Sequence, residues 1–235
     1  DREIPHIVLI DYNSGRGDQV IVDYLDGYDG YMHADGYPGY HKTQATIVGC
    51  WAHARRKFTD AQKAMGKNKS GKINWAINHI KKLYRVETLI KDKNIDERYH
   101  IRQEQSLPLL NEFKTWLIQS KSQVLGQTDL SDAIQYCLNQ WEKLERYTLD
   151  GRLSIDNNRA ERSIKPFVNG RKAWLLSQTA KGAKASAILY STVESAKANG
   201  LVPYDYITHL LEAFTQPEPD IEQLLPWNVK LGDGL

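Results

Sequence analysis

Two acidic residues occur in sequence contexts that could place a carboxylate at a metal site. Asp35 follows a short β-type run and precedes Gly36, so its carboxylate is expected in an exposed turn at the carboxyl end of a strand. On a helix, one turn would bring Glu161 together with Asn157 and Asn158, and cationic side chains follow. Carboxylates beside amides and cations have the chemistry that a hard divalent cation and a phosphate group require.

Each acid also has a simpler structural explanation. An Asp-Gly pair commonly bonds its own backbone in a turn, and the dipeptide alone favours that interpretation for Asp35. An acid in the first turn of a helix is stabilised by the positive end of the helix dipole, which would account for Glu161 equally well. The two acids therefore suggest a metal site but do not establish one.

Basic residues cluster in the same parts of the sequence and could hold phosphate groups. The clusters contain Arg55, Arg56, Lys57, Arg159, Arg162, Lys165, Arg171 and Lys172. Charged residues on helices usually form a solvated face, and the clustering alone favours that alternative. The formal net charge is only +2, from 31 basic and 29 acidic residues, so a polyanion would have to be bound by these local clusters.

Two other motifs do not support a site. A Gly-x-Gly sequence at 15–17 resembles the start of a dinucleotide-binding loop, but Val20 stands where that fingerprint needs glycine or alanine. Cys50 and His53 have the spacing of half a zinc site, yet no second pair with comparable spacing occurs in the sequence. Structural roles are therefore favoured for Cys50 and His53.

Short β-type runs are expected to position Asp35. Residues 7–10 are aliphatic throughout and indicate a buried strand, and residues 30–34 and 45–49 indicate two more strands. A helical pattern begins at Cys50 or Trp51, so three strands are predicted before the first long helix. Successive helical faces over 72–147, without strand signals, predict an all-helical insertion.

The region around Glu161 is also predicted to be helical. Residues 148–155 indicate a turn with a short hairpin, and Asp156 is a plausible N-cap of the helix that carries Glu161. That helix is expected to stop near Pro166, because proline cannot continue the hydrogen-bond ladder. Two further helices and a proline-containing tail are expected at 183–197, from Pro203 onward and at 216–235.

The composition restricts the class of protein. With 235 residues, of which 41% are hydrophobic, the chain is long enough for one large domain or a domain with an insertion. Cys50 and Cys137 are the only cysteines, which is typical of a reducing, cytoplasmic environment. The densest apolar run, 7–10, is far too short to span a membrane.

Several sequence blocks together resemble the transposase of insertion sequence 66. In chain order they are Asp35-Gly36-Tyr37-Pro38-Gly39-Tyr40, Cys50-Trp51-Ala52-His53-Ala54-Arg55-Arg56-Lys57-Phe58, Asn157-Asn158-Arg159-Ala160-Glu161-Arg162, Gly170-Arg171-Lys172 and Leu224-Leu225-Pro226-Trp227. The resemblance covers nearly the whole chain. It implies an α/β, ribonuclease-H-like fold whose mixed sheet carries two aspartates and one glutamate, which bind two divalent metal ions, Mg²⁺ or Mn²⁺, for DNA strand transfer.

The resemblance also assigns roles to the acids. Matched by motif, Asp35 is the second aspartate and Glu161 the glutamate, and the two are expected to lie close together. The first aspartate belongs to an Asp-Glu-Thr motif that this sequence lacks, so it is expected upstream of Asp1. Asp11 is a poor substitute, because its strand would be the third in such a sheet, about 9–10 Å from the vacant position. The chain by itself is therefore expected to be inactive.

The resemblance implies a domain division and a set of partners. The divisions are 1–65 for the first part of the catalytic core, 66–150 for a helical insertion, 151–215 for the second part of the core with the glutamate-bearing helix, and 216–235 for a C-terminal tail. DNA, as transposon ends and target, is the implied partner of the basic residues, and a homo-oligomer is the implied working form. Two alternatives stay open, namely a ribonuclease-H-like nuclease that cuts without joining and a non-catalytic DNA-binding or assembly module. The insertion could be a platform for DNA or for a second subunit.

Overall fold

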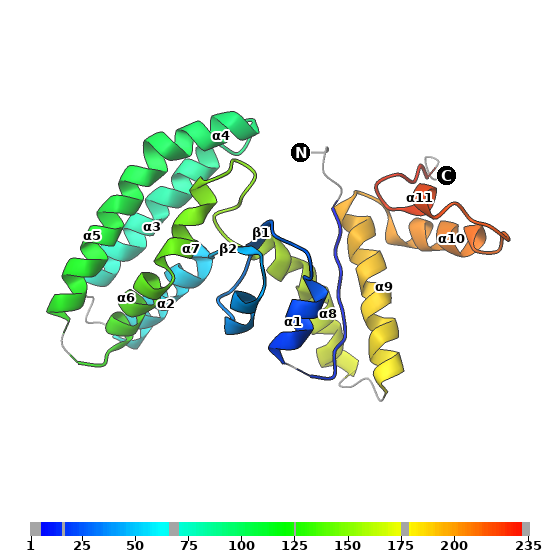
Figure 1. The fold of residues 1–235 in the computed structure, drawn as a ribbon, viewed down its shortest axis with the longest axis horizontal. Helices are drawn as coiled ribbons and strands as arrows, with labels where there is room; N and C mark the ends of the chain where they lie inside the picture. Colours follow the sequence, from blue (N-terminus) through cyan, green and yellow to red (C-terminus); the bar gives the residue numbers. More distant parts are fainter. Residues whose placement is uncertain (1–5, 16, 66–70, 125, 175–178, 232–235) are drawn as a thin grey trace. The chain divides into compact units, whose positions relative to one another are not determined.

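The computed structural model describes residues 6–15, 17–65, 71–124, 126–174 and 179–231 (Figure 1). These residues form two compact units. The helical unit contains the described residues within 17–159, and the terminal unit contains those within 6–15 and 160–231. The division in the chain falls in the first turn of helix α8 (Asn158–Trp174).

A small parallel sheet lies in the helical unit. Strands β1 (Tyr31–His33) and β2 (Thr46–Val48) pair in register, Met32 opposite Ile47, and the bond from the Ala34 amide to the Val48 carbonyl extends the ladder. The 3₁₀ helix η1 (Pro38–Lys42) occupies the crossover between the two strands. Both strands were predicted from their β-type runs, and both are confirmed.

An ion pair and a side-chain hydrogen bond fix the crossover. Helix α1 (Asp18–Tyr24), which the sequence pattern did not predict, begins with Asp18. The Asp18 carboxylate accepts a hydrogen bond from the Tyr37 hydroxyl at 3.1 Å and pairs with the Lys42 ammonium at 2.9 Å. These contacts hold η1 against α1 and so fix the loop that follows Asp35.

The rest of the helical unit is helical, as predicted for 72–147. Its elements are α2 (Trp51–Ala64), α3 (Gly71–Leu89), α4 (Ile95–Ile101), the π-helical turn η2 (Arg102–Ser106), α5 (Leu107–Gln123), α6 (Asp129–Asn139), α7 (Trp141–Glu145) and the 3₁₀ turn η3 (Arg146–Thr148). Capping boxes start α4 at Asn94 and α6 at Thr128, so their first amides are satisfied by side chains. Helices α4, η2 and α5 follow one another without a break (Figure 1).

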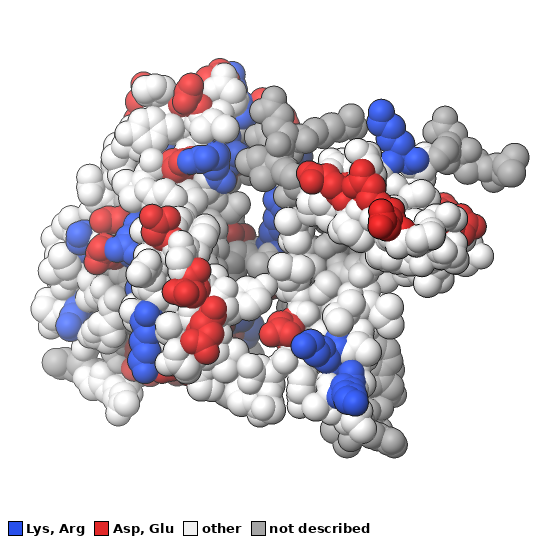
Figure 2. Space-filling model, turned by 45° about the vertical axis from the view of Figure 1, so that its right-hand side comes forward, with Lys and Arg blue, Asp and Glu red and all other residues white. Residues whose placement is uncertain are grey.

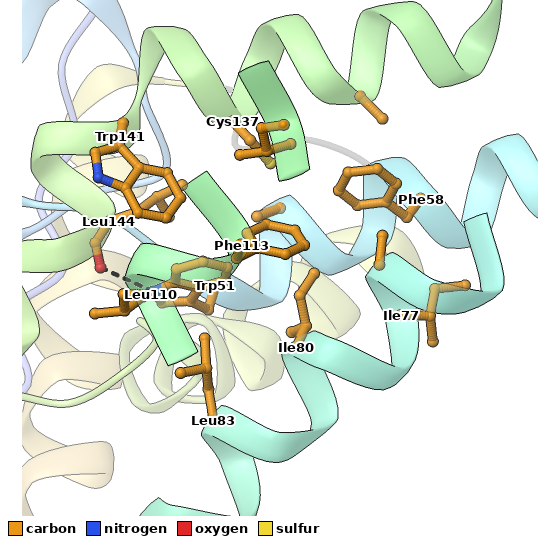
Figure 3. Close-up of a cluster of buried hydrophobic side chains, with 14 of the residues drawn as sticks. Trp51, Phe58, Ile77, Ile80, Leu83, Leu110, Phe113, Cys137, Trp141 and Leu144 are labelled. Atoms are coloured by element: carbon orange, nitrogen blue, oxygen red, sulfur yellow. Dashed lines mark hydrogen bonds between the residues drawn. The ribbon is translucent and has the colours of Figure 1, made fainter. Parts of the chain in front are cut away.

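One hydrophobic cluster joins α2 to the predicted insertion. Trp51 and Phe58 of α2 are fully buried and pack around Phe113 of α5, with ring centroids 5.7 and 6.1 Å from it (Figure 3). The Trp51 indole also donates a 2.8 Å hydrogen bond to the Leu144 carbonyl. Since α2 follows β2 directly, this core fixes the carboxyl end of the small sheet. The domain division expected from the sequence stays a prediction.

The terminal unit contains an extended segment that is not part of a sheet. The Val8 and Ile10 amides donate to the hydroxyls of Ser195 and Ser191 on α9 (Ala180–Ala198), at 2.9 and 2.8 Å. Ile7 is 55% exposed. The prediction of a buried strand over 7–10 was therefore wrong. Among the described residues no strand lies beside this segment, and serine hydroxyls satisfy its backbone groups instead.

Helix α8 differs from its prediction at its C-terminal end. It continues through Pro166 to Trp174, so the expected stop at Pro166 was wrong. Proline removes one hydrogen bond, to the carbonyl of Arg162, at a cost of about 3 kcal/mol that packing of the following turn can outweigh. Phe167 in that turn contacts Tyr190 of α9 edge-to-face, with centroids 5.3 Å apart.

The last helices follow the sequence prediction. Helix α9 covers the predicted range 183–197, and α10 (Pro203–Ala213) begins at the predicted proline. A short helix, α11 (Ile221–Leu224), follows, and the Tyr206 hydroxyl of α10 donates to the Leu224 carbonyl at 2.7 Å. No helix among the described residues is both long and apolar enough to cross a membrane.

The fold class is confirmed only in its coarser form. A mostly helical chain with a two-stranded parallel sheet is an α/β arrangement, and this sheet is the only one within the described residues. The larger mixed sheet of a ribonuclease-H-like fold is not present there. The expected third strand, 7–10, is the extended segment of the terminal unit, so the spacing argument against Asp11 no longer applies.

The buried His79 is expected to make stability depend on pH. Its ring is 1% exposed, its Nε2 donates to the Leu109 carbonyl at 2.8 Å, and burial lowers its pKa despite Glu112 nearby. The unfolded chain therefore takes up a proton below about pH 6.5 that the folded chain does not, so this stability is complete above that pH and is lost as pH falls. In urea unfolding between pH 7.5 and 5, His79→Gln should show a smaller loss of stability than wild type. The exposed His100→Gln is the control, and equal pH slopes for His79→Gln and wild type would contradict the expectation.

Candidate metal and nucleic-acid site

Asp35 lies at the carboxyl end of β1, in a tight turn. Its side chain is exposed, and Oδ1 accepts the Tyr37 amide at 3.2 Å. Gly36 has φ +94°, a left-handed conformation that glycine adopts without strain. The turn interpretation of the Asp-Gly pair is thus correct, and the same turn presents a carboxylate at the strand end. The bond from Tyr37 uses only one of the two carboxylate oxygens.

Tyr136 of α6 borders this turn. A side-chain carbon added at Gly36 would lie 3.9 Å from the Tyr136 hydroxyl. Burial, with smaller contributions from neighbouring groups including Asp35, raises the pKa of Tyr136 to about 12, so its hydroxyl keeps its proton. The Lys57 ammonium lies 5.6 Å from the centroid of the Tyr136 ring. The structure therefore brings Asp35 and one of the predicted DNA-binding residues to the same aromatic side chain.

The start of α8 is fixed by side chains from distant parts of the helical unit. Asp156 accepts the Asn158 amide, the first of the helix, at 3.1 Å; the helix begins at Asn158, so the N-cap position is Asn157, one residue later than the sequence predicted. The Tyr84 hydroxyl of α3 donates to the other Asp156 oxygen at 2.8 Å. The Cys50 thiol accepts the Asn157 amide at 3.5 Å, which supports the structural role expected for Cys50.

Electrostatics at these contacts favours neutral side chains. Burial and the Asp156 carboxylate raise the pKa of Tyr84, so this hydroxyl remains a donor at physiological pH. Burial also raises the pKa of the Cys50 thiol, which argues against a reactive thiolate. Asp156 is therefore held by neutral donors, and its own charge is directed at the first amides of α8, where the helix dipole favours it.

Glu161 lies in the first turn of α8 and is half-buried. This position is the one that the sequence predicted for it. Asp35 belongs to the helical unit and Glu161 to the terminal unit, so their expected proximity stays a prediction.

The predicted DNA-binding residues are exposed wherever their side chains are described. On α2 these are Arg55, Arg56 and Lys57, and on α8 they are Arg159, Arg162, Lys165 and Lys172. The side chain of Arg171 lies outside the described residues. Figure 2 shows Lys and Arg interspersed with Asp and Glu on the face in view.

Three residues that contact the Asp35 turn or the segment before α8 were not predicted from the sequence. Tyr84 and Tyr136 had no signal beyond helical spacing. His33, two residues before Asp35, accepts the Ser154 amide at its Nε2, at 3.2 Å. A neutral His33 therefore carries its proton on Nδ1, a buried atom without a hydrogen-bond partner among the described residues. Burial lowers the pKa of His33, which keeps the ring neutral.

Comparison with known proteins places these residues in a family. The chain matches the Transposase IS66 family over residues 1–185 and the IS66 C-terminal element over residues 191–227. Both candidate acids, the exposed basic residues and the supports around them fall within the first match. No solved structure matches the chain.

Similar curated proteins come from Sinorhizobium fredii (strain NBRC 101917 / NGR234). Uncharacterized protein y4qI is 32% identical over 240 residues, which is 96% of this chain and 44% of that protein. Uncharacterized protein y4jD is 33% identical over 220 residues, 88% of this chain and 42% of that protein. The chain thus spans less than half the length of these relatives. Matched by the family from residue 1 to 185 and by its C-terminal element beyond, the chain belongs to the IS66 transposase family.

Proposed function

We propose that this chain forms part of the catalytic core of a DNA transposase that cleaves DNA and transfers the strand with the help of divalent metal ions. Family membership supports the proposal most directly. The position of Asp35 at the carboxyl end of a parallel strand, and of Glu161 in the first turn of α8, supports it independently. A ribonuclease-H-like arrangement of the complete core is part of the proposal.

The donor atoms of the chain suit Mg²⁺ or Mn²⁺. Asp35 presents an exposed carboxylate with one oxygen outside its turn, and Glu161 offers a second carboxylate, and hard cations prefer such oxygen ligands. When bound, the two ions of such sites activate an oxygen nucleophile and stabilise displacement at phosphorus. Asp35 and Glu161 would hold them. The tight turn at Gly36, with its bond from the Tyr37 amide, orients the short Asp35 side chain, so little side-chain entropy would be lost when its carboxylate binds an ion.

The basic residues would bind the DNA backbone. Arg55, Arg56 and Lys57 stand on α2, whose first residue lies three positions after the carboxyl end of β2. Because β1 and β2 are parallel, this end of β2 lies at the same edge of the sheet as the end of β1 that Asp35 follows. Arginine and lysine at such positions neutralise phosphates and orient the duplex without reading its sequence. We propose DNA, as element ends and target, for this surface, and a homo-oligomer as the working form.

Alone, the chain is expected to show no metal-dependent nuclease activity. Matched by motif, it would supply two of the three carboxylates expected of the proposed site, and a hard dication needs several oxygen ligands. Supercoiled plasmid incubated with the chain and Mg²⁺ or Mn²⁺ should remain as intact as in EDTA. The decisive comparison is the Asp11→Asn variant. Robust nicking by the unaltered chain that disappears in this variant would contradict the expectation and assign the first catalytic position to Asp11.

The proposed reaction is tested in an extended protein, in which the upstream part of an IS66 family transposase precedes this chain. Element-end DNA is offered together with a target plasmid, and hydrolysis and joining are measured side by side. Joining supports a transposase. Cutting without joining supports a nuclease, and metal-independent binding with neither product supports a DNA-binding or assembly module.

A further inference from the structure

Arg102, in the π-helical turn η2, is a fully buried charged residue whose five N–H donors all have partners. Its Nε and Nη2 bond the two carboxylate oxygens of Glu87, at 2.9 and 2.7 Å. Its Nη1 bonds the carbonyls of Tyr147 and Asp150, both at 2.9 Å, and Nη2 also bonds that of Leu153, at 2.8 Å. The donors of an arginine number five, so no hydrogen-bonding capacity is left unused.

Three of these five bonds hold one irregular segment. We call residues 147–157 the strap, because they lead from the last two residues of η3 to the start of α8, between the labels α7 and α8 in Figure 1. The side-chain amide of Gln103, next to Arg102, donates a fourth bond, to the Thr148 carbonyl at 2.7 Å. At Gly151 an added side-chain carbon would lie 1.9 Å from the Ile95 carbonyl oxygen, so the strap contacts the backbone of α4 directly. Residues of α4 and η2 therefore hold the strap at four carbonyls and one glycine.

The second half of the strap is bound residue by residue to the rest of the helical unit. The Ser154 amide donates to His33 and the Ile155 carbonyl accepts the Trp51 amide, at 3.2 and 3.1 Å. Asp156 and Asn157 make the contacts to Tyr84 and Cys50 described above. Most residues of the strap therefore have a defined partner, from Tyr147, whose carbonyl Arg102 binds, to Asn157, whose amide Cys50 binds.

A buried ion pair is weak evidence for stability, because well-packed apolar residues of similar size stabilise a core as well or better. An apolar residue at 102, however, could not bond three carbonyls, and the strap would lose its defined path. Arg102 is the first residue of the π-helical turn η2, and such turns are rare and frequently lie at functional sites. The arrangement is therefore better explained by positioning than by stability.

We infer that Arg102 is a positioning residue, which fixes the strap and through it the first turn of α8, where Glu161 lies. The inference rests on the function proposed above for Glu161 and gives the helical insertion a role in aligning the site. It predicts that loosening the strap frees the start of α8 before the rest of the helical unit unfolds.

The test measures amide hydrogen exchange in the 235-residue chain. Arg102→Lys keeps the charge but offers only three donors on a flexible stem, so it cannot retain all five bonds. Exchange of the Ser154, Asn157 and Asn158 amides should rise about tenfold or more relative to the buried Cys137 amide of α6. Using this ratio removes any uniform loss of stability, since global unfolding would accelerate both sets equally.

Two further variants complete the measurement. Gly151→Ala loosens the strap without altering Arg102 and should raise the same ratio, which preserves the test if Arg102→Lys folds poorly. Arg85→Lys changes an exposed arginine on α3, the helix that also carries Glu87, and should leave the ratio unchanged. An unchanged ratio in both Arg102→Lys and Gly151→Ala would overturn the inference.

Activity separates this inference from the proposed function. In the extended protein, Arg102→Lys should raise several-fold the Mn²⁺ concentration that gives half-maximal strand transfer, and Arg85→Lys should not. A faster-exchanging strap with an unchanged metal requirement would overturn the link to Glu161. If the unaltered extended protein transfers no strands, the proposed function fails, while the exchange ratios still decide whether Arg102 positions α8.

Discussion

Asp35→Asn and Glu161→Gln, each introduced into the extended protein, are expected to lower strand transfer at least about 1,000-fold, because each would remove a proposed metal ligand worth several kcal/mol in the transition state. Both changes keep the shape of the side chain and remove its charge. The Asp35 turn should survive, since the asparagine oxygen can still accept the Tyr37 amide. Strand transfer of labelled element-end DNA, with circular dichroism to confirm folding, provides the measurement.

Matched controls separate a site effect from a general effect of charge. Asp92→Asn alters an exposed aspartate in the turn after α3, and Glu212→Gln alters an exposed glutamate on α10. Both variants should retain strand transfer within about twofold, because surface substitutions away from special features change stability by less than about 0.5 kcal/mol. Transposition retained by Glu161→Gln would refute the catalytic role of this residue. Equal losses in the controls would show that net charge and not metal binding is responsible.

Trp51→Ala is expected to destabilise the helical unit by about 3–5 kcal/mol, as truncation of a buried tryptophan typically does. The ring is 0% exposed and packs against Phe113 and Trp141, so its loss leaves a cavity at the centre of the aromatic cluster (Figure 3). The Leu144 carbonyl also loses its hydrogen bond from the indole. For a unit of this size the midpoint of thermal unfolding should fall by about 6–20 °C.

Thermal unfolding followed by circular dichroism measures this effect, with two variants for comparison. Trp51→Phe keeps most of the ring but not the indole donor, and its loss should be smaller. Tyr204→Ala removes an aromatic side chain that is 78% exposed, and should change the midpoint by no more than a degree or two. A Trp51→Ala protein as stable as Tyr204→Ala would contradict the description of the core.

Local patterns determined much of this fold. The β-type runs at 30–34 and 45–49 became β1 and β2, and the helical faces over 72–147 became the helices from α3 to α7. Such patterns succeed because side-chain periodicity follows from backbone geometry within a few residues. The Asp-Gly turn at Asp35 was predictable for the same reason, since its side chain bonds an amide only two residues away, and Asp156 likewise bonds the amide of Asn158, although the helix begins one residue later than predicted.

Contacts between distant residues decided the rest. A strand needs a neighbouring strand to bond its backbone groups, and the aliphatic pattern at 7–10 does not show whether such a neighbour exists. In the structure Ser191 and Ser195 bond this extended segment instead of a strand. Pro166 stays within α8 because its neighbour Phe167 packs against Tyr190, a residue in another helix.

The sequence by itself determined the family motifs, the two candidate acids and the elements that carry them. Only the tertiary structure decided what holds those elements in place. Arg102 bonds three carbonyls that lie 45 to 51 residues away in the chain. Every residue has a backbone carbonyl, so no sequence pattern marks the ones that a buried guanidinium will reach. That choice is made when α3, η2 and the strap pack together and exclude water, because a buried donor must then find a protein acceptor.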